Sequence, residues 1–171
     1  MIDIDKIKSL TLEFIKAIGE DPTREGLKET PERVAKMCKE IFAGLEKPPE
    51  NMIKTFTEDL TTNNIVEIPN IPVNSVCEHH LLPFVGTATV KYIPNNGKIM
   101  GLSKFVRVVD YFSRRPQVQE RLTKQIAEFL FSKLSAKYVE VILECEHMCM
   151  TMRGVKTSGI ATKTVYTCGN T

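Results

Sequence analysis

The sequence predicts an α+β fold in which paired helices accompany an antiparallel sheet. Three observations support this prediction. Two helical patterns open the chain, several strand patterns follow one another in its middle, and two further helical patterns precede a second group of strands. Strands that follow one another directly favour an antiparallel sheet over a doubly wound parallel one, in which strands and helices take turns.

The N-terminal segment, residues 1–48, is expected to be helical. Apolar residues recur at helical spacing over residues 4–18 and the pattern then stops at a glycine. A second helix is expected from Thr30 to near Gly44, because the Thr30 hydroxyl can cap free amides and a proline follows at the first helical position. Cys38 lies on the apolar face of that helix and is expected to pack in the core.

The sheet and the second helix pair are expected within residues 60–171. In chain order we expect strands over residues 65–68, 71–76 and 84–92, a tight turn at 95–97, helices over 103–112 and 116–134, and strands over 139–145 and 160–166. The clearest strands alternate apolar and polar residues, the turn contains Asn-Asn-Gly, and the longer helix carries its apolar residues on one face. Because no repeat or linker is visible, we expect a single domain over residues 1–171.

Composition restricts the class of protein. A content of 42% hydrophobic and 26% charged residues is ordinary for a globular domain. The formal charge of +2 is too small to indicate a nucleic acid or an anionic membrane as a partner. No signal peptide and no membrane-spanning stretch is recognisable. An odd number of cysteines in a chain of this size predicts reduced thiols in a cytoplasmic protein, some of them binding a metal. They are Cys38, Cys77, Cys145, Cys149 and Cys168.

The three histidines of the chain gather beside cysteines in two short segments. Cys77 and His80 have the spacing at which one bend of the chain can present a thiolate and an imidazole to one ion. His147 and Cys149, at the end of an expected strand, would face the same side of it. Sulfur and imidazole ligands select zinc, and His79 lies in the same cluster.

Spacing alone leaves the kind of metal site open. Four protein ligands would close a structural site. Three would leave a position for water, and a spare histidine could then act as an acid or a base.

Basic residues favour a site for a polyphosphate. Arginine can bind phosphate oxygens with two hydrogen bonds, and Ser103 at an expected helix start offers a hydroxyl beside free amides. A solvent-exposed helix face is the alternative explanation. It is the stronger explanation for Arg114, Arg115, Arg121 and Lys124. That group consists of Lys104, Arg107, Arg114, Arg115, Arg121 and Lys124, and Arg153 follows the second metal segment.

Two alternative interpretations concern Glu120 and the chain as a whole. Glu120 could accept two hydrogen bonds from a guanine edge, or it could pair with Arg121 or Lys124, and the residues alone favour the ion pair. The whole chain could also be a non-catalytic zinc module that binds nucleic acid through its basic helices. The small net charge and the lack of aromatic residues among the cations of residues 114–124 argue against that module.

Four motifs in one order resemble the GTP cyclohydrolase I family, and the similarity runs from about Thr30 to Tyr166. They are Cys77-Glu78-His79-His80, Gly101-Leu102-Ser103-Lys104, the segment RPQVQERLT at residues 115–123, and the segment HMCMTMRG at residues 147–154. The resemblance implies a subunit of the tunnelling fold, assembled by its sheet edges into rings and by rings into a homodecamer, with active sites between subunits.

The resemblance also implies a reaction and its catalytic groups. Cys77, His80 and Cys149 would hold one zinc ion per subunit, and His79 and His147 would be the free acid and base groups. The implied reaction is hydrolytic opening of the imidazole ring of GTP, with release of formate and formation of 7,8-dihydroneopterin triphosphate, the first step of tetrahydrofolate or pterin biosynthesis.

The resemblance further implies how the substrate is bound. Glu120 and Gln119 would recognise guanine, Ser103 would lie near the ribose, and phosphate contacts would come from Lys104, Arg107 and Arg153, with Arg33 and Lys36 as additional contacts. The alternative within the same fold is another pterin or purine enzyme, which would not need Cys77, His80 and Cys149 together with His79 and His147. Cys145 and Cys168 match no ligand position and are expected to be structural.

Overall fold

The computed structural model describes residues 2–58 and 64–170 of the chain. Residues 1 and 171 lie outside the described residues. The expected start of the sheet region, at residue 60, also lies outside them. The helices are α1 (Ile4–Ala17), α2 (Thr30–Ile41), α3 (Leu102–Ser113), α4 (Gln119–Leu134) and α5 (Met148–Thr151). The strands are β1 (Thr55–Thr57), β2 (Val66–Cys77), β3 (Pro83–Ile93), β4 (Lys98–Met100), β5 (Pro116–Gln117), β6 (Tyr138–His147) and β7 (Ala161–Gly169).

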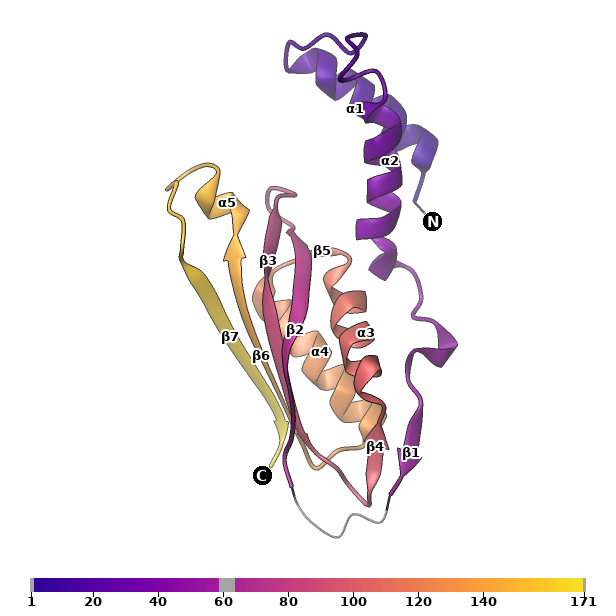
Figure 1. The fold of residues 1–171 in the computed structure, drawn as a ribbon, viewed down its shortest axis with the longest axis vertical. Coiled ribbons are helices and arrows are strands. Elements are labelled where there is room, and N and C mark those ends of the chain that lie inside the picture. Colours follow the sequence, from indigo (N-terminus) through magenta and orange to yellow (C-terminus); the bar gives the residue numbers. More distant parts are fainter. Residues whose placement is uncertain (1, 59–63, 171) are drawn as a thin grey trace.

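One curled sheet forms the body of the molecule, in the order β5-β2-β3-β6-β7 (Figure 1). The four long strands pair antiparallel, which confirms the predicted α+β class, while the two-residue β5 pairs parallel with the end of β2. β1 and β4 form a separate two-stranded sheet. Among the described residues, no helix has both the length and the apolar character needed to cross a bilayer.

Helices α3 and α4 cover one face of the sheet and enclose the core (Figure 1). Their inward side chains are fully buried because the helical spacing of the apolar residues puts them on one face, opposite the alternate apolar residues of the strands. This core contains Phe105 and Val108 of α3, Leu122, Ile126 and Leu130 of α4, and Val73, Val90, Val141 and Leu143 of the sheet. Cys145 is also buried here, whereas Cys38 is half-buried and lies outside this cluster.

The structure corrects three of the expected boundaries. The two strands expected over 65–76 are one strand, β2, whose register shifts between Ile68 and Ile71, where Asn70 takes a φ of 57°. The helix expected from Pro116 begins at Gln119, because the two preceding residues pair with the end of β2. The segment after His147 is not extended but turns at once into α5.

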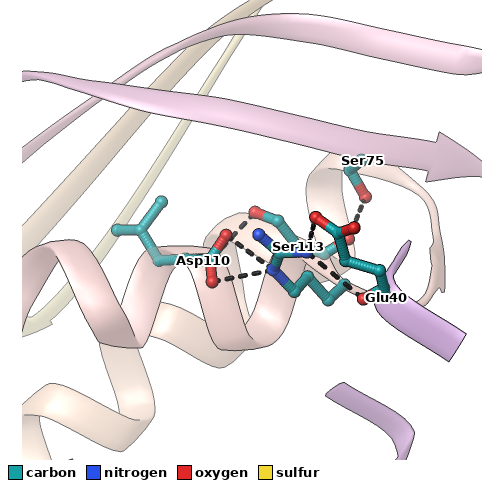
Figure 2. Close-up of polar contacts among 6 residues, drawn as sticks. Glu40, Ser75, Asp110 and Ser113 are labelled. Carbon is teal, nitrogen blue, oxygen red and sulfur yellow. Dashed lines mark hydrogen bonds and ion pairs between the residues drawn. The ribbon is translucent and has the colours of Figure 1, made fainter. Parts of the chain in front are cut away.

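Helices α1 and α2 pack on each other as a hairpin that projects beyond the end of the sheet, with the end of α2 near α3 (Figure 1). Several of their large apolar side chains stay exposed, including Leu10, Phe14 and Ile18 at 57%, 63% and 60%. Figure 2 shows the polar contacts where the end of α2 meets α3 and β2. The Arg114 guanidinium forms ion pairs with Asp110 and Glu40, and the Ser75 hydroxyl donates to the backbone oxygen of Ser113.

Candidate metal and catalytic site

The sheet brings the two metal segments together. β3 pairs with β2 on one side and with β6 on the other, so the end of β2, the start of β3 and the end of β6 lie at the same end of the sheet. A tight turn links Cys77 to β3, closed by hydrogen bonds between Cys77 and the backbone of Leu81 and Leu82. The register places Phe84 of β3 opposite His147 of β6.

Three side chains at this end form a donor set for a metal ion. One ligand atom each of Cys77, His80 and Cys149 lies within 4.8 Å of the others. Tetrahedral zinc, with bonds of about 2.0 Å to nitrogen and 2.3 Å to sulfur, needs ligand atoms roughly 3.5–3.8 Å apart, so a small contraction would close the site. The set leaves one tetrahedral position open, which is typical of a catalytic site.

The two thiols of the donor set lie close together, with their sulfur atoms within 4.8 Å of each other. Burial, and then the neighbouring Cys77 thiol, raise the pKa of Cys149. Without a cation the protonated Cys149 thiol is favoured, and a bound metal ion would stabilise its thiolate. Cys145 is different. Burial raises the pKa of its thiol to about 12, and it remains a structural core residue, as expected.

The two remaining histidines lie beside this donor set in different environments. His147 is half-buried, stacks on the Phe84 ring with centroids 4.6 Å apart, and has its Nε2 2.9 Å from Gln119 Oε1. Burial lowers its pKa, against a smaller raising effect of Glu120, so the neutral imidazole is favoured. His79 is exposed, with Nδ1 3.6 Å from Cys77 Sγ.

A cavity of about 200 Å³ joins these groups to the start of α4. It is lined by both cysteine ligands, by His79 and His147, and by Glu120. The pairing of β5 with the end of β2 explains this arrangement, since it fixes the first turn of α4 beside the metal segment. The two cations considered as partners of Glu120 pair elsewhere, Arg121 with Glu78 and Lys124 with Glu128.

Arg153 also lies at the site. Its Nη1 is 2.9 Å from His80 Nε2, so the guanidinium donates and the imidazole nitrogen accepts. A neutral imidazole has a single accepting nitrogen, and a metal ion would need that same lone pair. The contact with Arg153 and coordination of a metal by His80 therefore exclude each other.

Five of the residues expected at the site are not brought to it within one chain. Ser103 and Lys104 lie in the first turn of α3, about 15 Å along the helix from the end that meets the metal segment. Lys104 donates to the backbone oxygen of Asn51. Arg107 lines a separate cavity of about 550 Å³ with Asp110 and Arg114. On α2, exposed Arg33 and Lys36 pair with Glu29 and Glu32.

Sequence reasoning missed three contributors to the site. Glu78 accepts two hydrogen bonds from Arg121, at 2.6 and 3.0 Å, which fastens the turn after Cys77 to α4. Phe84 supplies the ring under His147, and Thr164 bonds the Gln119 amide. The position of Glu78 between two functional residues was a signal, but its partner lies 43 positions away and only the fold shows it.

The fold and the site define a class of protein, a mixed α+β protein with a Cys-His-Cys group that could hold a metal ion and two further histidines beside it. The GTP cyclohydrolase I family model matches residues 7–171, and the chain belongs to that family. A GTP cyclohydrolase 1 of Acetivibrio thermocellus is 52% identical over 164 residues, covering 96% of this chain and 87% of the relative. One of Streptomyces griseus is 55% identical over 163 residues, covering 95% and 81%.

A solved structure shares the fold. The archaeosine synthase QueF-Like in the apo form matches 65% of this chain and 99% of its own, with a TM-score of 0.51 and 20% sequence identity. At this identity the match supports the mixed α+β architecture alone.

Proposed function

We propose that the chain catalyses the zinc-dependent hydrolytic opening of the imidazole ring of GTP, releasing formate and forming 7,8-dihydroneopterin triphosphate, the first step of tetrahydrofolate or pterin biosynthesis. The observation that carries this proposal is the cavity in which a Cys-His-Cys donor set, two further histidines and Glu120 meet. Membership of the GTP cyclohydrolase I family supports it.

Each of these groups has a distinct task in the proposed reaction. Cys77, His80 and Cys149 hold the ion, and zinc bound there supplies a Lewis acid and lowers the pKa of a water ligand. His147, kept neutral by burial, accepts a proton, while exposed His79 is the second group able to give or take one. Glu120 accepts hydrogen bonds from the guanine edge, and adenine would leave its charge unpaired.

The proposed site is completed by further copies of the chain. The cavity of about 200 Å³ is smaller than the 300–1,000 Å³ typical of ligand sites, and GTP needs phosphate contacts that one chain does not bring to it. Ser103, Lys104 and Arg107, with Arg33 and Lys36 as weaker candidates, would come from neighbouring subunits. We propose a tunnelling-fold ring closed through sheet edges, paired into a homodecamer, with one zinc per subunit.

We place the protein in the cytoplasm. All five cysteines are free thiols, as a reducing compartment would keep them, and two of them belong to the donor set.

Turnover of GTP tests the proposed function. The zinc-loaded protein, incubated with GTP under reducing conditions, should release formate and yield a pterin that fluoresces after oxidation. ATP serves as the matched control and should give neither product. Absence of formate from zinc-replete protein would refute the assignment, and metal analysis of the same sample identifies the ion.

A further inference from the structure

The side chain of Gln119 has an orientation that its neighbours fix. It opens α4 and is 1% exposed. Its Nε2 lies 3.2 Å from the backbone oxygen of Leu143, 2.8 Å from that of Thr162 and 3.0 Å from the hydroxyl oxygen of Thr164. Two of these three partners are carbonyls, which only accept, so the amide nitrogen must face them and Oε1 must face His147.

The threonines around Gln119 are consistent with this orientation of the amide. The Thr123 hydroxyl donates to the backbone oxygen of Gln119 at 2.7 Å. The Thr164 hydroxyl, 2.6 Å from that of Thr123, must therefore be the donor in their contact, and its oxygen remains free to accept from Gln119. If the amide were flipped, the buried Oε1 would face the carbonyl oxygens of Leu143 and Thr162 with no hydrogen between them, which is strongly unfavourable.

This arrangement decides which nitrogen of His147 carries the proton. Oε1 of Gln119 can only accept, so the nitrogen 2.9 Å away, Nε2, must donate. In a neutral imidazole the lone pair then lies on Nδ1. Stacking on Phe84, with an angle of 12° between the rings, holds the plane of His147.

We propose that Gln119 is a positioning residue that fixes His147 in the tautomer with the proton on Nε2, so that Nδ1 is the nitrogen that exchanges a proton with the substrate. The catalytic meaning rests on the proposed function, whereas the tautomer itself does not. This role replaces the guanine contact expected for Gln119, because its side chain is buried, its two amide hydrogens are shared among three protein acceptors, and Oε1 accepts from His147. Recognition of guanine is then left to Glu120.

The test is the ring nitrogen spectrum of His147 in the zinc-loaded protein. The chain has three histidines, so ring-15N labelling gives few signals, and solid-state NMR does not depend on the size of the assembly. The His147→Gln variant identifies the signals that belong to His147. Wild type should show a protonated Nε2 and an unprotonated Nδ1.

Substitution of Gln119 supplies the second part of the test. Gln119→Met has a similar length but no acceptor, and it should show both tautomers and a kcat lower by about 10- to 100-fold with unchanged zinc content. Gln119→Glu keeps an acceptor, and its carboxyl group, kept protonated by burial against the two carbonyl oxygens, should preserve the wild-type tautomer despite lower stability. Thr164→Val leaves both carbonyls on the amide and is the matched control, with the tautomer unchanged.

Three outcomes would overturn the proposal. They are a proton on Nδ1 in the wild type, a wild-type tautomer in Gln119→Met, or mixed tautomers in Gln119→Glu. If Gln119→Met does not fold, the wild-type and Gln119→Glu spectra still decide. A protonated Nε2 in a protein that releases no formate would refute the proposed function and leave the tautomer assignment standing.

Discussion

At the scale of single residues, two side chains that lie two positions apart in the sequence have different partners. His147 ends β6 and bonds to Gln119, whereas Cys149 lies in the first turn of α5 and joins Cys77 in the donor set. The change from strand to helix between them separates a group that can move protons from a group that can hold a metal. His80 and Arg153 show a second contrast, because their contact has to end before His80 can bind an ion.

Replacement of His147 and of Cys149 should have different consequences. His147→Ala should retain zinc near the parent level and stop GTP turnover, because the imidazole lies outside the donor set. Cys149→Ala is the matched control and should lose zinc, since only two ligands remain. Metal analysis after dialysis measures both. Loss of zinc from His147→Ala would show that this histidine is a ligand.

Arg153→Ala should weaken the binding of GTP by about 10- to 100-fold, the size of a charge-assisted hydrogen bond, and leave guanosine binding nearly unchanged. The reason is that the proposed contact is to phosphate, made once zinc has displaced the guanidinium from His80. Zinc affinity should not fall, since the arginine competes for the same lone pair. Calorimetry with each ligand measures these affinities, and equal losses for GTP and guanosine would contradict the phosphate role.

At the scale of elements, the site depends on how closely β3 approaches β6. Gly86 of β3 lies opposite Cys145 of β6. A Cβ on Gly86 would lie 2.0 Å from the backbone oxygen of Glu144 and 2.7 Å from Cα of Cys145, so no side chain fits there. This contact lies two residues along β3 from the pair that Phe84 forms with His147.

Gly86→Ala should therefore destabilise the fold by roughly 1–3 kcal/mol, because the strands must separate to admit the methyl group. Denaturant unfolding measures the change. Gly26→Ala is the matched control with little expected effect, since its added Cβ would meet only the mobile end of the Arg24 side chain at 3.0 Å. Equal midpoints for wild type and Gly86→Ala would show that the strands can adjust.

At the scale of the whole molecule, the residues of the proposed site lie far apart within one chain. The metal ligands, His79, His147, Glu120 and Arg153 gather where β2 and β6 end. Ser103 and Lys104 lie in the first turn of α3, which begins at the opposite end of the sheet (Figure 1). The exposed apolar residues of the α1–α2 hairpin are a second indication that several copies assemble, because a monomer would leave these side chains exposed to water. Assembly of several copies accounts for both features.

Co-expression of two inactive variants tests whether the site is shared. His147→Ala and Lys104→Ala chains should each be inactive or nearly so, while mixed assemblies should recover activity at about one quarter of the sites, those with both residues intact. Formate release by the co-purified mixture measures the recovery. Activity no higher than the average of the parents would place Lys104 outside a shared site.

The sequence by itself determined the α+β class, the long helices and the turn at residues 95–97, because the periodicity of apolar residues and the turn residues act locally. It also indicated the metal segments, since thiols and imidazoles at ligand spacing are rarely coincidental. Tertiary structure alone decided the partners of residues far apart in sequence. It paired Glu78 with Arg121 and directed Gln119 to His147, because strand register and the start of α4 depend on packing of the whole chain.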